Sequence, residues 1–216
     1  LSNTNVIDFG YSLAFDSSEN LYVGARNRDG DGHVYMYSYS QHTVPNYLLS
    51  IDLSSSATDT AFGHSLAISD SKILAVGAPY SNDAHGVVYL YQNGIPYTTP
   101  DISFAGSIGF GYSLAFDSSE NLYIGQPFGS EGRVHVYSYP DYTTPLYDLS
   151  AGNLHWVEFG SSISVNDKYI FVGDNIANNL FIFDRDDINN GNINHNLTIS
   201  SGQAVASTPT HFAVGD

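Results

Sequence analysis

One string of fourteen residues occurs twice in this sequence without a single change, and no other feature constrains the fold as much. The string FGYSLAFDSSENLY spans residues 9–22 and returns at residues 110–123. Looser copies begin at Phe62 and Phe159, and the glycines after the four phenylalanines lie 53, 48 and 49 residues apart. Self-similarity at such a period is typical of repeat architectures, whose units bury apolar faces against one another.

A second glycine ends the apolar run that follows each copy. The distance from the first glycine to the second is 14, 14, 14 and 13 residues in the four copies. Gly202 and Gly215 are again 13 residues apart, which predicts the start of a fifth unit. We therefore expect a single region spanning residues 1–216, with four units at 9–61, 62–109, 110–158 and 159–201 and a partial unit at 202–216.

Each unit is predicted to contain four short strands. In the second unit, residues 65–69 alternate small and apolar side chains, and residues 73–76 form a continuous apolar run, as in a strand covered on both faces. A third strand is predicted at 87–91, before the hairpin signal at 93–94, and a weaker fourth at 98–104. The third strand recurs at 33–39, 133–139 and 180–184, and the fourth at 47–53, 146–149 and 196–200. Helical periodicity is absent over any useful length.

This pattern predicts an all-β fold, a β-propeller of four-stranded antiparallel blades with four full blades and two strands of a fifth, within a larger propeller. A single sheet cannot bury both of its faces, whereas sheets stacked around an axis can. Each phenylalanine is expected to fill the gap between adjacent blades, and each glycine to permit close backbone approach or positive φ. These repeat positions are Phe9, Gly10, Gly24, Phe62, Gly63, Gly77, Phe110, Gly111, Gly125, Phe159, Gly160 and Gly173.

The second unit carries three motifs of a known repeat. Its Phe62-Gly63 start, the apolar strand that ends in Val-Gly-Ala-Pro at 76–79, and the Gly-Val-Val-Tyr-Leu-Tyr sequence at 86–91 resemble the FG-GAP repeat. That repeat builds the propeller of integrin α subunits and of many microbial surface proteins. The resemblance extends over nearly the whole chain in four copies. It implies an extracellular or cell-surface protein that works in adhesion.

The resemblance does not extend to the calcium-binding loop of many family members. Those members carry an Asp-x-Asn-x-Asp-Gly loop between the first and second strands. Here the corresponding turns are residues 16–20 and 117–121, with only Asp70-Ser71 and Asn166-Asp167 in the other units. These turns are short and lack the glycine that lets a chain wrap a cation with 6–8 oxygen ligands.

Two other segments could hold a cation, and calcium is the cofactor that they would take. Asp29 and Asp31 alternate with glycines in a loop. The segment 184–194 is dense in oxygen ligands, although Ile188 stands where an EF-type loop needs one. Solvated β-turns favour the same residue types, so the turn interpretation competes at both places. The candidate ligands in the longer segment are Asp184, Asp186, Asp187 and Asn190.

The charge balance limits the partners. The chain has 22 Asp and Glu against 6 Lys and Arg, for a formal net charge of −16. Such a chain repels phosphate backbones and anionic headgroups, so we expect neither nucleic-acid binding nor electrostatic membrane binding. No apolar run approaches transmembrane length, so membrane insertion is not expected. Cysteine is absent, which removes disulfides and thiolate chemistry.

No catalytic set can be recognised. The eight histidines lack metal-ligand spacings, and His64 occupies a slot that Tyr11, Tyr112 and Ser161 fill in the other units, which is typical of tolerated variation. There is no Gly-x-Ser-x-Gly elbow. Two of the four glutamates lie in the repeated turns and are assigned to the scaffold. Asn196 begins the one N-glycosylation sequon. Tyrosines at period two in the third strands are expected to pack between blades.

Three hypotheses of function follow. The leading one is a non-catalytic interaction module that recognises a protein or glycan ligand through its loop-bearing face. The second is a structural subunit of a surface filament or sheath, in which copies of the chain associate through unpaired blade edges. The third is a propeller lyase or glycosidase, for which the sequence supplies no acid–base pair. Because one fold hosts many functions, the choice among them rests on analogy.

Overall fold

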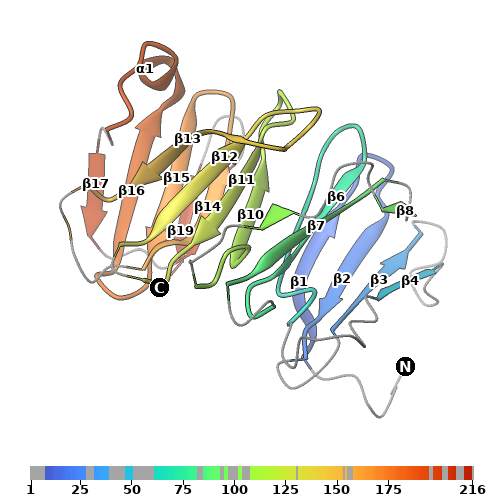
Figure 1. The fold of residues 1–216 in the computed structure, drawn as a ribbon. Coiled ribbons are helices and arrows are strands. Elements are labelled where there is room, and N and C mark those ends of the chain that lie inside the picture. Colours follow the sequence, from blue (N-terminus) through green and yellow to red (C-terminus); the bar gives the residue numbers. More distant parts are fainter. Residues whose placement is uncertain are drawn as a thin grey trace. The chain divides into compact units, whose positions relative to one another are not determined.

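The structure is a computed structural model, and its contacts divide the chain into two units, Leu1–Gly111 and Tyr112–Asp216, which are described separately below. Apart from one short helix, the described elements are all β-strands in antiparallel sheets (Figure 1). The residues that the structure describes are 8–27, 32–38, 47–50, 61–81, 85–92, 95–96, 102–103, 108–129, 131–152, 154, 158–194, 197–200, 204–207 and 212–215.

The first unit contains two sheets. One has the order β1-β2-β3-β4, and the other has the order β5-β6-β7-β8, with β9 also paired to β7. The strands of the first sheet are β1 Phe9–Phe15, β2 Leu21–Ala25, β3 His33–Tyr37 and β4 Tyr47–Ser50. Those of the second are β5 Ser65–Ile68, β6 Ile73–Ala78, β7 Val87–Gln92, β8 Ile95–Pro96 and β9 Ile102–Ser103.

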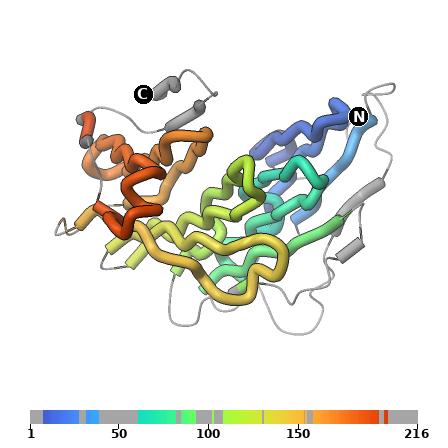
Figure 2. The backbone as a smooth tube through the Cα atoms, turned by 90° about the horizontal axis from the view of Figure 1, so that it is seen from above, coloured from blue at the N-terminus to red at the C-terminus, as the bar shows by residue number. Residues whose placement is uncertain are grey.

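The second unit repeats this plan, with sheet orders β10-β11-β12-β13 and β14-β15-β16-β17 and a hairpin of β18 and β19. The backbone path can be followed by residue colour in Figure 2. The third sheet comprises β10 Ser113–Phe116, β11 Leu122–Gln126, β12 Arg133–Tyr137 and β13 Pro145–Ser150. The fourth comprises β14 Phe159–Val165, β15 Tyr169–Asp174, β16 Asn179–Asp184 and β17 Leu197–Ser200, followed by β18 Ala204–Ser207 and β19 Phe212–Gly215.

The predicted all-β class is confirmed, and each sheet starts where a repeat unit starts. In the repeat at 62–109, the fourth strand predicted at 98–104 is described only as β9 at 102–103, and the other residues of that range lie outside the described ones. β9 and an additional short strand, β8, pair with opposite ends of β7.

One short helix, α1 Arg185–Asn189, lies in a segment for which no helix was predicted. Its first turn is capped by Asp184, whose carboxylate accepts a hydrogen bond of 2.9 Å from the backbone N–H of Asp186. Such a cap satisfies one of the N–H groups that a helix start leaves without an intrahelical partner. No described helix is long and apolar enough to cross a membrane.

The identical Asp-Ser-Ser-Glu-Asn strings make identical turns. The carboxylate of Asp16 accepts hydrogen bonds from the backbone N–H groups of Ser18 and Asn20 at 2.9 and 2.8 Å. Asp117 accepts the equivalent bonds from Ser119 and Asn121. An Asp side chain that binds backbone two and four residues on closes a tight turn without glycine. These two carboxylates therefore have a structural role in connecting the first and second strands.

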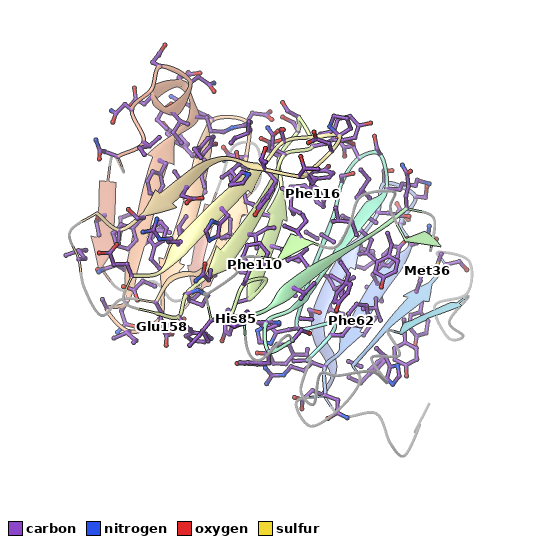
Figure 3. The ribbon with its side chains drawn as sticks, in the orientation of Figure 1. Met36, Phe62, His85, Phe110, Phe116 and Glu158 are labelled. Atoms are coloured by element: carbon purple, nitrogen blue, oxygen red, sulfur yellow. The ribbon has the colours of Figure 1, made fainter. Side chains whose placement is uncertain are left out.

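The apolar core lies between successive sheets within each unit. In the first unit, Phe62 packs in one cluster with Tyr22, Val34 and Met36 of the first sheet and with tyrosines of β7. Figure 3 labels Phe62 and Met36 of this cluster. The rings of Phe62 and Tyr89 meet edge to face at 5.6 Å. In the second unit, Phe159, Ile163 and Val165 of β14 pack in the same way on Tyr123, Val134 and Val136 of the preceding sheet.

Candidate functional site

A hydrogen bond recurs where a sheet meets the start of the next sequence repeat. In three repeats, the serine two residues after the first glycine donates from Oγ to the carbonyl of the first glycine in the next repeat. The bonds Ser12 to Gly63, Ser65 to Gly111 and Ser113 to Gly160 are each 2.7 Å long. Because the same bond joins residues 46 to 51 positions apart, it sets where each unit begins on the previous sheet.

The glycines at these joints leave no room for a side chain. A Cβ on Gly24, Gly77 or Gly125 would overlap the carbonyl oxygen of the first glycine in the next sequence repeat. Gly160, which supplies such a carbonyl, has φ +95, a conformation that other residues rarely adopt. We call each set of one serine and two glycines a joint, after Ser12/Gly24/Gly63, Ser65/Gly77/Gly111 and Ser113/Gly125/Gly160.

A second recurring arrangement lies beside the joints, on the side where the loops after the second strands emerge. In three of the four repeats, the residue after the Phe-Gly pair contacts a side chain from that loop. In the first unit Arg26 stacks on Tyr11, with Cζ 3.5 Å from the ring centre, and the ring of His64 lies 6.1 Å from that of Tyr80. The second unit has an equivalent aromatic pair, Tyr112 and Phe128, at 5.2 Å.

In the first unit these contacts merge into one cluster of Asp8, Tyr11, Arg26, His64 and Tyr80, which we call the loop-face cluster. Arg26 Nε donates to Asp8 Oδ2 at 3.0 Å, and Arg26 Nη1 lies 3.2 Å from His64 Nδ1. The rings of Tyr11 and His64 lie 4.9 Å apart. Tyr11 is 43% exposed, whereas His64 is buried. Interpreting His64 as tolerated variation misses this role, since its partner Arg26 is 38 residues away in the sequence.

The loop-face cluster offers groups that can contact a ligand. An exposed tyrosine ring offers an apolar face that can stack on a sugar or side chain, and its hydroxyl offers a hydrogen bond. The stacked guanidinium of Arg26 holds the ring in place and keeps donors close to it. The carboxylate of Asp8 neutralises the guanidinium.

A second polar cluster surrounds His135, a buried histidine in the third sheet. His135 lies 2.8 Å from Asp148 Oδ1 through Nδ1 and 2.7 Å from Gln126 Oε1 through Nε2. Burial lowers the pKa of His135 below its ordinary value, although the carboxylate of Asp148 acts in the opposite direction. A neutral ring donates from Nδ1 to Asp148 and accepts at Nε2 if the Gln126 amide is turned to present its NH2 group.

A third polar cluster joins the two sheets of the second unit. Arg185 Nη2 lies 2.6 Å from Asp117 Oδ2, and the side chain of Asp117 is fully buried. Tyr123 donates from its hydroxyl to the same carboxylate oxygen at 3.2 Å. Burial raises the pKa of Tyr123 far above its ordinary value. Asp117 thus accepts hydrogen bonds from both Arg185 and Tyr123.

Two of the four acidic-segment candidates have side-chain hydrogen bonds within their own segment. Asp184 caps α1, and the Asn190 amide donates back to the carbonyl of Asp186 at 2.9 Å. Within the described part of the chain, no group of three His, Asp or Glu side chains is placed to hold a metal ion. Asp29, Asp31 and the sequon residue Asn196 lie outside the described residues. Calcium binding stays a prediction.

The fold and the joints together define an all-β repeat protein of antiparallel sheets, in which three joints connect a sheet to the start of the next repeat. No protein-family model matches the chain, and no curated protein matches its sequence.

Proposed function

We propose that this chain forms part of a β-propeller and serves, outside the cell or on its surface, as a non-catalytic module that binds a protein or glycan ligand. The propeller interpretation is supported by the joints, which give successive sheets of each unit the same starting position on their neighbours. A repeated offset of this kind stacks sheets face to face, as blades require.

The observation that carries the binding proposal is the loop-face cluster. Tyr11 is exposed, yet it is held by stacking on Arg26, which is itself paired with Asp8. A ring that is already ordered loses little conformational entropy on binding, so more of its contact energy contributes to affinity. Loops carried by a rigid sheet scaffold are where binding residues concentrate.

The test is ligand binding by the whole chain and by a Tyr11→Ala variant. Immobilised chain would be screened against a glycan array and against extracellular matrix proteins, and the affinity for each hit would be measured. We expect the Tyr11→Ala variant to bind about tenfold more weakly, since truncation of an interface aromatic costs on the order of 1–2 kcal/mol.

Phe15→Ala is the matched control, because Phe15 lies on the same strand, is also exposed, and sits at the opposite end from the loop-face cluster. The control variant should bind like the parent. Equal losses in both variants would show that the exposed β1 side chains, and not the loop face, hold the ligand. Turnover of a polysaccharide substrate by the chain would contradict a non-catalytic role.

A further inference from the structure

The first strand of each sequence repeat carries three apolar side chains on one face. These side chains are much more exposed in the first repeat than their equivalents in later repeats. In β1 the three are Phe9, Leu13 and Phe15, which are 54%, 60% and 60% exposed. Their equivalents Phe62 and Phe159 are 1% and 0% exposed. We call Phe9, Leu13 and Phe15 the β1 stripe.

The registers show that these side chains are equivalent. Phe9, Leu13 and Phe15 lie opposite Ala25, Val23 and Leu21 of β2. In the fourth sheet, Phe159, Ile163 and Val165 lie opposite Asp174, Val172 and Ile170 of β15. Both ladders have the same irregularity after the phenylalanine. The β1 stripe is thus built like a covered face, but nothing in the described structure covers it.

Within each unit, the equivalent stripe is covered in the same way. The covering sheet presents an aromatic side chain from its second strand and two apolar side chains from its third. Phe62, Leu66 and Ile68 pack on such a trio, and so do Phe159, Ile163 and Val165. The covering trios are Tyr22, Val34 and Met36 in the first unit and Tyr123, Val134 and Val136 in the second.

We propose that the β1 stripe is the docking surface for one further four-stranded sheet of this repeat. That sheet presents an aromatic–apolar trio to Phe9, Leu13 and Phe15. Its serine donates to the carbonyl of Gly10, and its second-strand glycine admits that carbonyl, as in the three joints. Gly10 has φ +86, close to the φ values of Gly63 and Gly111, so it already has the conformation that a joint requires.

A second copy of the chain fits this surface less well. In the fourth sheet, the aromatic–apolar trio is Phe171, Leu180 and Ile182, and these side chains are already buried. The next element is the β18–β19 hairpin, where Ala204 lies opposite Gly215 at the position of the joint serine. Alanine cannot donate the hydrogen bond to Gly10. In the register of the hairpin, Ala213 takes the place of the aromatic residue. The partner is therefore a sheet that has the serine and the aromatic residue.

The experiment supplies such a sheet. A copy of residues 109–156, which contains Ser113 and Tyr123, is joined ahead of Ile7, because Ile7 to Gly10 corresponds to Val157 to Gly160 at a natural junction. Hydrogen exchange of the β1 backbone amides is then compared with and without the added unit. We expect exchange in β1 to slow by a factor on the order of ten or more, equivalent to about 1.4 kcal/mol of added protection.

Two variants keep the test specific. Leu13→Asp should be tolerated by the chain alone, because Leu13 is 60% exposed, but should abolish the added protection in the extended protein. Ser113→Ala, placed only in the added copy, should reduce the protection by removing the bond to Gly10. Unchanged β1 exchange in the extended protein, or full protection despite Leu13→Asp, would overturn the proposal.

Light scattering of the unextended chain addresses the competing occupant. A monomer across the micromolar range is the expected result. A dimer that Leu13→Asp dissociates would also overturn the proposal, because the stripe would then be covered by a second copy, as in a filament subunit.

Discussion

Single residues matter most at the joints, where two backbones approach with no space for a methyl group. Gly77 illustrates this, since an added Cβ would overlap both the Gly111 carbonyl and Ser65 Oγ. Neither neighbour can move without losing the hydrogen bond between Ser65 and Gly111. The glycines that end the second strands are thus explained by packing across sheets, whereas a chain turn would call for positive φ.

We expect Gly77→Ala to lower the free energy of unfolding by on the order of 3 kcal/mol, because overpacked backbone has to shift. Gly152→Ala is the control, since Gly152 has φ +72 and open space around its Cα. That change should cost only about 1 kcal/mol, the penalty of the left-handed conformation. Urea unfolding measures both, and equal costs would refute the steric interpretation of the joint.

His135 provides a prediction for pH. Its pKa is lowered in the folded chain by burial, so the unfolded chain binds the proton more readily. This histidine therefore contributes stability that is present above its unfolded pKa of about 6.5 and is lost as pH falls through the lower folded value. Stability measured by urea unfolding should fall between pH 7.5 and 5, and it should fall less in a His135→Asn variant. An identical pH dependence in the variant would exclude His135 as the cause.

The first strand of a repeat is stabilised by aromatic contacts with the sheet to which it belongs. The phenylalanine at the start of β14 is anchored between rings, with Phe181 at 5.1 Å and Phe183 at 6.0 Å, both edge to face. The tyrosine pair of β7 surrounds Phe62 in the same manner. Tyr89 and Tyr91, two of the tyrosines at period two, are therefore used in core packing, as the sequence pattern predicts.

Truncation of equivalent phenylalanines should separate covered from uncovered sheets. Phe159→Ala should cost about 3–5 kcal/mol of unfolding free energy, because it leaves a cavity between two sheets. Phe9→Ala should cost less than about 1 kcal/mol, since the Phe9 ring is already half exposed and contacts Tyr35 at 5.5 Å. Thermal unfolding of both variants measures the difference, and similar losses would argue that the two positions have the same environment.

The whole molecule carries a strong excess of negative charge. A formal net charge of −16 favours expanded states through self-repulsion. Ion pairs among the described residues offset little of this charge, because the chain has only 6 Lys and Arg. Screening should therefore stabilise the folded chain more than it weakens the few ion pairs.

We expect the melting temperature to rise by a few degrees when NaCl increases from about 0.02 to 0.5 M, over which the Debye length falls from roughly 20 to 4 Å. Calcium chloride at matched ionic strength serves as the comparison. A larger shift with calcium would point to a specific site in the acidic segments, whereas a fall in melting temperature with salt would show that ion pairs outweigh the repulsion.

Much of the architecture follows from the amino-acid sequence alone. The sequence predicts the repeat period, the four short strands per repeat and the strand boundaries to within a few residues. These features depend on local alternation of side chains and on turn chemistry, which can be recognised in the sequence. The start of each unit at a Phe-Gly pair is explained in the same way. The helix α1 escapes this reasoning because its five residues are too few to show a period.

Only the tertiary structure determined which residues meet across sheets. The bond from Ser65 to Gly111, the contact of Arg26 with His64 and the pair of Arg185 with Asp117 join residues 38 to 68 positions apart. The identical strings at 9–22 and 110–123 contain the same phenylalanine, yet Phe9 is exposed and Phe110 is buried. The difference has a physical cause: burial depends on whether another sheet lies above a face, and the local pattern of side chains is the same in either case.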